Sequence, residues 1–263
     1  MFKTRVITAI IFAPALLLLI YLGSWPLLIA LGIFTGVGVY EYGKMMTAKN
    51  YQVPYPLLIA AAISIMVAVG QAAWWLLGLI FVVVLVLLII WAMRKQEKFP
   101  GIMLSLGGIM YIGIGFGFVL LLRLPPHTWS ILILVFLLTW ATDVGAYLLG
   151  SAFGKKKLAP AISPNKTVAG AVGGVICAAV TTLVFGLLFV GIPWYLLIII
   201  GVIGSLFGQF GDLFESMIKR WSGIKDSGGF FPGHGGVLDR FDSVLFVAPT
   251  VYFLLMFFNY LGA

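Results

Sequence analysis

Long apolar runs constrain the fold of this chain more than any other feature. Nine of them occupy approximately residues 5–22, 26–46, 55–70, 73–93, 102–122, 129–150, 168–190, 193–213 and 242–261. Most are long enough for a helix to cross a bilayer, which takes about 20 residues. They are continuously apolar rather than alternating, which excludes a transmembrane β-barrel. With 62% hydrophobic residues and a mean hydropathy of +1.16, the sequence predicts an all-α, polytopic integral membrane protein with about nine transmembrane helices.

The charged residues predict how these helices are oriented. Fifteen of the 16 basic residues fall on alternate connections, and Arg123 alone falls on the other side. Because cytoplasmic loops are enriched in Lys and Arg, the N-terminus is expected in the cytoplasm. The net charge of +8 then reflects topology and attraction to the lipid bilayer rather than binding to nucleic acid. The acidic residues lie on the same side, so charged chemistry is expected at the cytoplasmic face.

We expect the chain to form a single membrane domain over residues 1–263. Residues 1–125 would be supporting helices with a possible lipid or dimer surface. Residues 129–263 would be catalytic helices carrying a cytoplasmic motif at 211–242. Glycine pairs spaced four residues apart predict close helix packing, within the chain rather than between copies. These pairs are Gly32/Gly36, Gly113/Gly117, Gly170/Gly174 and Gly204/Gly208.

One polar stretch, residues 212–242, holds five of the eight acidic residues of the chain. Carboxylates mixed with Lys and Arg beside flexible glycine backbone are typical of metal-dependent phosphate chemistry. If the eighth apolar segment continues as a helix, Asp212, Glu215 and Lys219 lie on one face. Asp239 and Asp242 are expected together at the start of the last helix. Simple ion pairing of Asp212 and Glu215 with Lys219 and its basic neighbours is the alternative interpretation.

The loop Phe231–Gly236 is expected to be irregular because of its proline and glycines. Such a loop brings backbone N–H groups close to a phosphate, although it is also compatible with a simple re-entry loop. His234 within it is interpreted as a phosphate donor or positioning group. The hard oxygen ligands nearby suit Mg²⁺, which shares its coordination with substrate phosphates.

Two upstream elements point to the same face. Asp143 lies inside the sixth apolar segment, and an acid within a membrane helix is a functional candidate. Further along, Lys166 stands beside Ser163 and Thr167 and is a candidate ligand of a triphosphate or a lipid phosphate. The nearby run Lys155–Lys157 is interpreted as a surface run that sets topology.

The segment Ser216–Asp242, hereafter the signature segment, resembles the signature of the phosphatidate cytidylyltransferases (CDP-diacylglycerol synthases). The family pattern is S-x-apolar-K-R, four residues, K-D, then a glycine-rich step into P-x-H-G-G-apolar-x-D-R-apolar-D. Every specified position is met, and the match covers about a tenth of the chain. The matching residues are Ser216, Ile218, Lys219, Arg220, Lys225, Asp226, Gly228, Phe231, Pro232, His234, Gly235, Gly236, Val237, Asp239, Arg240, Phe241 and Asp242.

The resemblance implies the reaction of CTP with phosphatidate to give CDP-diacylglycerol and pyrophosphate. It also implies a homodimer in the bacterial inner membrane with its active site facing the cytoplasm. A paired-metal site with Mg²⁺, and K⁺ as a possible second metal, would use Asp212 and Asp239. Catalytic roles are expected for Lys219, Arg220, Lys225, Asp226, His234, Arg240 and Asp242. Substrate-binding roles are expected for Asp143, Ser163, Lys166, Thr167, Glu215, Ser216, Gly235 and Gly236.

Two other functions share some of these features. A CTP-dependent kinase of a lipid alcohol such as dolichol would share topology and nucleotide, but it would transfer the γ-phosphate. A membrane transporter would carry charged residues near mid-membrane in several helices, which the one-sided charge distribution disfavours.

Overall fold

The computed structural model describes residues 2–123 and 129–260. The described part is predominantly helical, which confirms the all-α prediction. The predicted internal boundary at residue 125 lies outside the described residues.

The helices follow the nine predicted apolar segments. Within residues 2–123 and 129–260, seven helical segments are long and apolar enough to cross a membrane by length and composition, and two apolar helices, Ile10–Leu22 and Tyr55–Gly70, are shorter. A polytopic membrane protein is therefore confirmed, while the exact number of crossings and the orientation stay predictions. The helices are α1 (Phe2–Leu22), α2 (Ser24–Thr47), α3 (Tyr55–Gly70), α4 (Trp74–Lys95), α5 (Phe99–Leu121), α6 (Trp129–Phe153), α7 (Val168–Phe189), α8 (Trp194–Ser222), α9 (Leu238–Phe241) and α10 (Val244–Phe257).

The chain divides into two compact units, and each is described by itself. The first unit comprises Met1–Leu124 and Ile218–Phe241, and the second comprises Pro125–Met217 and Asp242–Ala263. Most of the signature segment therefore belongs with the N-terminal helices. Its first two residues and its last belong with the second unit.

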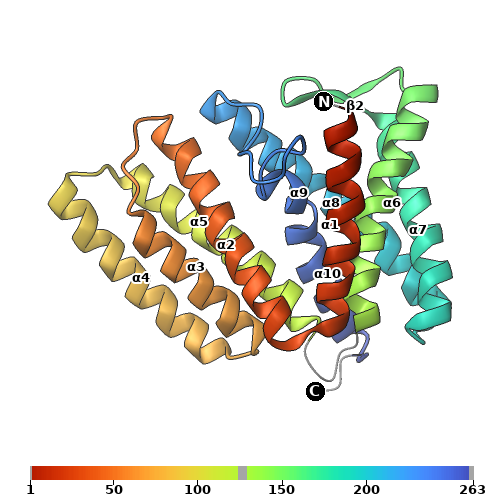
Figure 1. Cartoon of the computed structure of the whole chain (residues 1–263), viewed down its shortest axis with the longest axis horizontal. Helices are drawn as coiled ribbons and strands as arrows, with labels where there is room; N and C mark the ends of the chain where they lie inside the picture. Colours follow the sequence, from red (N-terminus) through yellow and green to blue (C-terminus); the bar gives the residue numbers. More distant parts are fainter. Residues whose placement is uncertain (1, 124–128, 261–263) are drawn as a thin grey trace. The chain divides into compact units, whose positions relative to one another are not determined.

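In the first unit, α3 and α5 pack closely, with α2 and α4 beside them (Figure 1). Glycines allow this approach: Gly113 faces the backbone of Ala62, and Gly117 faces the side chain of Val69. Phe116 between them on α5 is fully buried. The pair Gly113/Gly117 thus packs within the chain, as predicted.

Arg123, the one basic residue outside the predicted cytoplasmic set, has a structural role in the same unit. Its guanidinium donates to the carbonyl oxygens of Ile20 at 2.6 Å and Tyr21 at 2.9 Å. These carbonyls end α1, where a helix favours a positive charge. The exception to the charge pattern is therefore explained by helix capping.

In the second unit, α6 and α7 lie side by side (Figure 1), joined by a two-stranded antiparallel hairpin. The hairpin, β1 (Lys157–Ala159) and β2 (Ser163–Thr167), was not predicted from the sequence. Thr167 ends β2 and caps α7, because its hydroxyl oxygen accepts from the N–H of Gly170 at 3.1 Å. Glycines again sit at the contact: Gly170 faces the carbonyl of Ala146, and Gly174 faces that of Thr142.

The crossing of α6 and α7 gives a stability prediction. A methyl group at Gly145 would lie 2.5 Å from the carbonyl oxygen of Gly173 and 2.7 Å from the side chain of Cys177. Gly145→Ala should therefore push the helices apart and destabilise the protein by about 1–3 kcal/mol. Thermal unfolding in detergent, followed by size-exclusion chromatography, measures this loss. Gly78→Ala on α4, where nothing lies within 4 Å, is the matched control, and equal Tm values for the two variants would contradict the packing argument.

Candidate functional site

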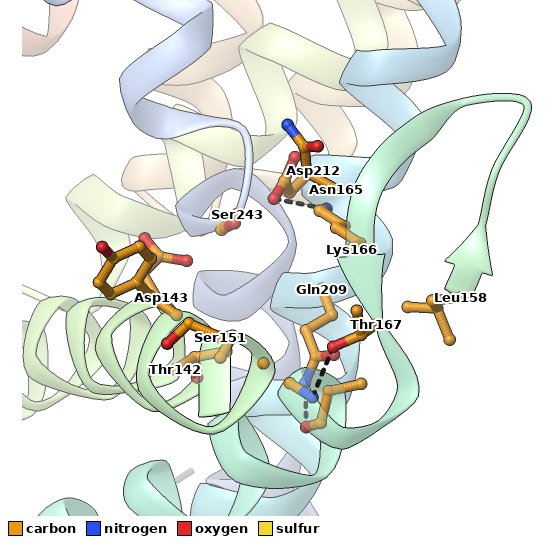
Figure 2. Close-up of a pocket in the computed structure, with 15 residues that line it drawn as sticks. Thr142, Asp143, Ser151, Leu158, Asn165, Lys166, Thr167, Gln209, Asp212 and Ser243 are labelled. Atoms are coloured by element: carbon orange, nitrogen blue, oxygen red, sulfur yellow. Dashed lines mark hydrogen bonds and ion pairs between the residues drawn. The ribbon is translucent and has the colours of Figure 1, made fainter. Parts of the chain in front are cut away.

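A cavity of about 490 Å³ lies within the second unit, against α6, the hairpin, α7 and α8. Thr142, Asp143 and Ser151 lie on one side of it, and the β2 residues Asn165 and Lys166 lie on the other (Figure 2). Four predicted site residues, Asp143, Lys166, Thr167 and Asp212, line this one cavity. The structure thus brings together residues up to 69 positions apart in the sequence.

Lys166 and Asp212 form an ion pair across the cavity wall, with Nζ and Oδ2 2.5 Å apart (Figure 2). Both residues line the cavity, with side chains 26% and 33% exposed, and the Nζ atom of Lys166 itself is buried beside Asp212. The other oxygen of Asp212, Oδ1, accepts from the hydroxyl of Ser216 at 3.4 Å. The partner of Asp212 is therefore Lys166 rather than Lys219, which the ion-pair alternative had named.

Acidic residues gather around Asp212 in the same unit. The carboxylate of Asp242 is repelled by those of Asp212, Glu215 and Asp143, and Glu215 is 1% exposed. Asp242 also accepts from the N–H of Ser243 at 2.6 Å, between α9 and α10. Asp143, Asp212, Glu215 and Asp242 thus bring four acidic side chains into this region, where a cation would reduce their repulsion.

A buried polar network at the cavity was missed by the sequence reasoning. The amide nitrogen of Gln209 donates to the carbonyl of Ala171 at 3.2 Å and to the hydroxyl of Ser205 at 3.3 Å. The hydroxyl of Thr142 lies 3.0 Å from that of Ser205. The signal was present on α8, where Ser205, Gln209, Asp212 and Ser216 recur at helical spacing.

In the first unit, Asp239 organises the loop that precedes α9. Its Oδ1 accepts from Nζ of Lys219 at 2.7 Å, and the side chains are 7% and 13% exposed. Its Oδ2 accepts from the N–H and hydroxyl of Ser227, both at 2.9 Å, and from the N–H of Gly236 at 2.8 Å. In this conformation Asp239 is fully engaged by protein donors, and the N–H of Gly236 faces a carboxylate rather than an open phosphate site.

Glu41 on α2 is a second residue that the sequence reasoning did not select. Its carboxylate accepts from the N–H groups of Val237 and Leu238, each at 3.0 Å, and lies 3.0 Å from the hydroxyl of Ser227, whose single proton it shares with Asp239. Glu41 is 3% exposed. No pattern in a single sequence indicates a contact between residues 41 and 237.

The other predicted residues lie outside these two networks. Arg220, Lys225, Asp226 and Arg240 are exposed on the first unit, and His234 and Gly235 are half-buried in its loop. Ser163 begins β2 opposite Ala159 and is not among the residues lining the cavity. The predicted continuation of the eighth segment is confirmed, since Asp212, Glu215 and Lys219 all belong to α8.

The donor set decides how well Mg²⁺ would fit. Among the described residues, no three His, Cys, Asp or Glu side chains are grouped closely enough to hold a metal ion. Asp212 nevertheless offers a part-exposed carboxylate close to other acidic side chains, which suits a hard cation. Asp212 would have to release Lys166, and Asp239 would have to release Lys219 or a backbone donor, so binding of Mg²⁺ requires a rearrangement at both carboxylates.

Membrane helices, a cavity with a lysine–aspartate pair and a glycine loop shaped by carboxylates define a membrane-bound enzyme that handles phosphate groups. Comparison with known proteins gives the family. The model of the "Cytidylyltransferase family" matches residues 3–258, so the chain belongs to this family.

Individual relatives agree over nearly their whole length. A protein of Bacillus subtilis strain 168 named "Phosphatidate cytidylyltransferase" is 35% identical, with 98% of each chain covered. Proteins of the same name from Staphylococcus saprophyticus and Staphylococcus aureus strain COL are each 38% identical, covering 97% of this chain and 99% of theirs. The resemblance stated for the signature segment is confirmed.

Proposed function

We propose that this protein is a phosphatidate cytidylyltransferase, which transfers the cytidylyl group of CTP to phosphatidate in phospholipid biosynthesis. The observation that carries this function is the match to relatives of that name at 35–38% identity over almost the entire chain. The cavity beside the Lys166–Asp212 pair and the intact signature segment support it.

In the reaction, a phosphate oxygen of phosphatidate forms a bond to the α-phosphorus of CTP. The bond from that phosphorus to the bridging oxygen of the β-phosphate breaks, and pyrophosphate leaves. No covalent enzyme intermediate is required, so the protein positions two anions and screens their repulsion. Lys166, Asn165 and Thr167 are suited to hold phosphate oxygens at the cavity. The predicted cations Lys219, Arg220, Lys225 and Arg240, with His234, would screen charge at the signature segment.

A divalent cation, Mg²⁺, is part of the proposal, with K⁺ as a possible second metal. Asp212 and Asp239 are the proposed metal ligands; to bind a metal, Asp212 would exchange Lys166, and Asp239 would exchange Lys219 or a backbone donor. When bound, the metal would neutralise charge on the phosphates and polarise the phosphorus. Glu215, Asp143 and Asp226 are assigned supporting roles in orienting cations.

The proposed location is the bacterial inner membrane, with the active site facing the cytoplasm. The clustering of basic residues on alternate connections supports this orientation. A homodimer is proposed as well, on the family resemblance alone.

The purified protein in detergent should release pyrophosphate from CTP only when phosphatidate and Mg²⁺ are both present. Chelation by EDTA should abolish the release, and added Mg²⁺ should restore it. Product analysis separates the rival function, because a lipid-alcohol kinase leaves CDP rather than pyrophosphate. Pyrophosphate release that ignores phosphatidate would refute the proposed function, and release that survives EDTA would refute the metal.

A further inference from the structure

Glu41 is a buried acid that none of the proposed chemistry uses. It lies on α2, beside α9 (Figure 1), and is separated from its partners in the signature segment by 186 to 197 residues. Burying a carboxylate in a membrane helix is unfavourable unless donors compensate it. Two backbone N–H groups and one hydroxyl do so here, and all three belong to the signature segment.

The backbone at two glycines of the signature segment packs directly against this carboxylate. At Gly228 an added methyl group would overlap Oε1 of Glu41, and at Gly236 it would overlap Oε1 of Glu41 and the hydroxyl oxygen of Ser227 equally. At Gly228, all three nearest atoms belong to Glu41. The glutamate could move aside only by giving up its hydrogen bonds to Val237 and Leu238. These glycines therefore make room for Glu41.

Ser227 connects Glu41 to the predicted catalytic groups. Its hydroxyl lies 3.0 Å from Oε2 of Glu41 and 2.9 Å from Oδ2 of Asp239, and Asp239 in turn binds Lys219. A displacement of Glu41 is thus transmitted through one serine to a lysine–aspartate pair. Residues that orient other functional groups in this way have large effects on activity without contacting substrate.

We propose that Glu41 is a positioning residue of this enzyme, which holds the loop Ser227–Asp239 in the conformation in which Asp239 pairs with Lys219. This inference rests on the proposed function, because it assigns the purpose of the loop to that reaction. It adds a residue outside the signature segment to the set required for turnover.

Two neighbouring glycines provide a matched test. Gly228→Ala places a methyl group against Glu41, whereas Gly229→Ala places one where nothing lies within 4 Å. Neither glycine has a positive φ, so alanine is compatible with both backbones. Gly228→Ala should lower kcat about 100-fold, the effect expected of a displacement of about 1 Å at reacting groups, with KM for CTP little changed. Gly229→Ala should match the wild type.

Changes at Glu41 itself should reproduce this loss. In Glu41→Gln, either orientation of the amide sets an NH₂ group against a backbone N–H, of Val237 or of Leu238, so kcat should again fall about 100-fold. The Glu41→Ala variant removes the carboxylate that the new methyl group of Gly228→Ala would overlap. The double variant Glu41→Ala/Gly228→Ala should therefore be no slower than Glu41→Ala alone, a non-additive result.

Hydrogen–deuterium exchange gives a readout that does not need activity. Exchange in peptides covering residues 227–239 should speed up in Gly228→Ala and Glu41→Gln but not in Gly229→Ala, with little change in overall Tm. The inference is overturned if Gly228→Ala is as active as Gly229→Ala, or if the double variant shows the product of the two single losses. A wild type without cytidylyltransferase activity would refute the proposed function instead, and the exchange data would still report whether Glu41 shapes the loop.

Discussion

Asp239→Asn is expected to lower kcat for CDP-diacylglycerol formation about a thousandfold, the scale seen when a preorganised charged or polar group is lost. The carboxylate accepts from the ammonium of Lys219 and from the N–H groups of Ser227 and Gly236, and it shares the hydroxyl proton of Ser227 with Glu41. An asparagine NH₂ in place of either oxygen meets a donor, and the ammonium of Lys219 loses its counter-charge at a site that is only 13% exposed. Initial rates in detergent with saturating CTP and phosphatidate measure the effect.

A double variant distinguishes the loss of stability from the loss of catalytic activity in this experiment. Breaking one partner of a buried ion pair costs about 3–5 kcal/mol, whereas removing both partners costs much less. Asp239→Asn/Lys219→Met should therefore recover part of the lost Tm without recovering activity. Glu97→Gln is a matched control, because Glu97 also accepts backbone N–H groups in the first unit, from Gln52 and Lys98. Wild-type rates in Asp239→Asn would remove this residue from the mechanism.

Lys166→Met is expected to reduce kcat/KM for CTP about 100-fold. Lys166 is the partner of Asp212, and Asp212 contributes to the repulsion acting on Asp242. Without the lysine the cavity becomes more negative, so it repels a triphosphate more strongly. Steady-state rates at varied CTP and fixed phosphatidate measure the loss.

Lys156→Met is the matched control for this variant. Lys156 lies in the nearby exposed run and borders a separate groove with Phe153 and Val172, not the cavity. The Lys156→Met variant removes one positive charge at a similar place in the sequence but outside the cavity. It should therefore leave kcat/KM for CTP close to the wild-type value. Equal losses in the two variants would show that net surface charge, rather than the Lys166–Asp212 pair, governs CTP binding.

The membrane fold was predictable because burial in lipid imposes long apolar runs that are visible in the sequence. The acidic stretch was equally visible, since charged residues are rare elsewhere in this chain. Which residues pair was not predictable. Asp212 turned out to bind Lys166, on a hairpin that the apolar pattern does not reveal. The partners of Glu41 lie almost 200 positions away, and periodicity reports only neighbours along one helix or strand.

The contacts among the cavity residues were also not predictable from the sequence. Thr142 and Gln209 lie in apolar runs, where isolated polar residues usually satisfy a local backbone bond. Their common network appears only when α6, α7 and α8 are assembled. Spacing along α8 predicts which side chains share a face, but not which other helices that face meets.

The interleaving of the two units has a consequence for how this protein can be dissected. A fragment beginning at residue 129 would retain the entire signature segment and every predicted metal ligand. It would nevertheless lack α2 and with it Glu41, so the glycine loop would have lost the anion around which it is folded. A fragment with the complete motif would therefore lack the contacts that Glu41 makes to its loop.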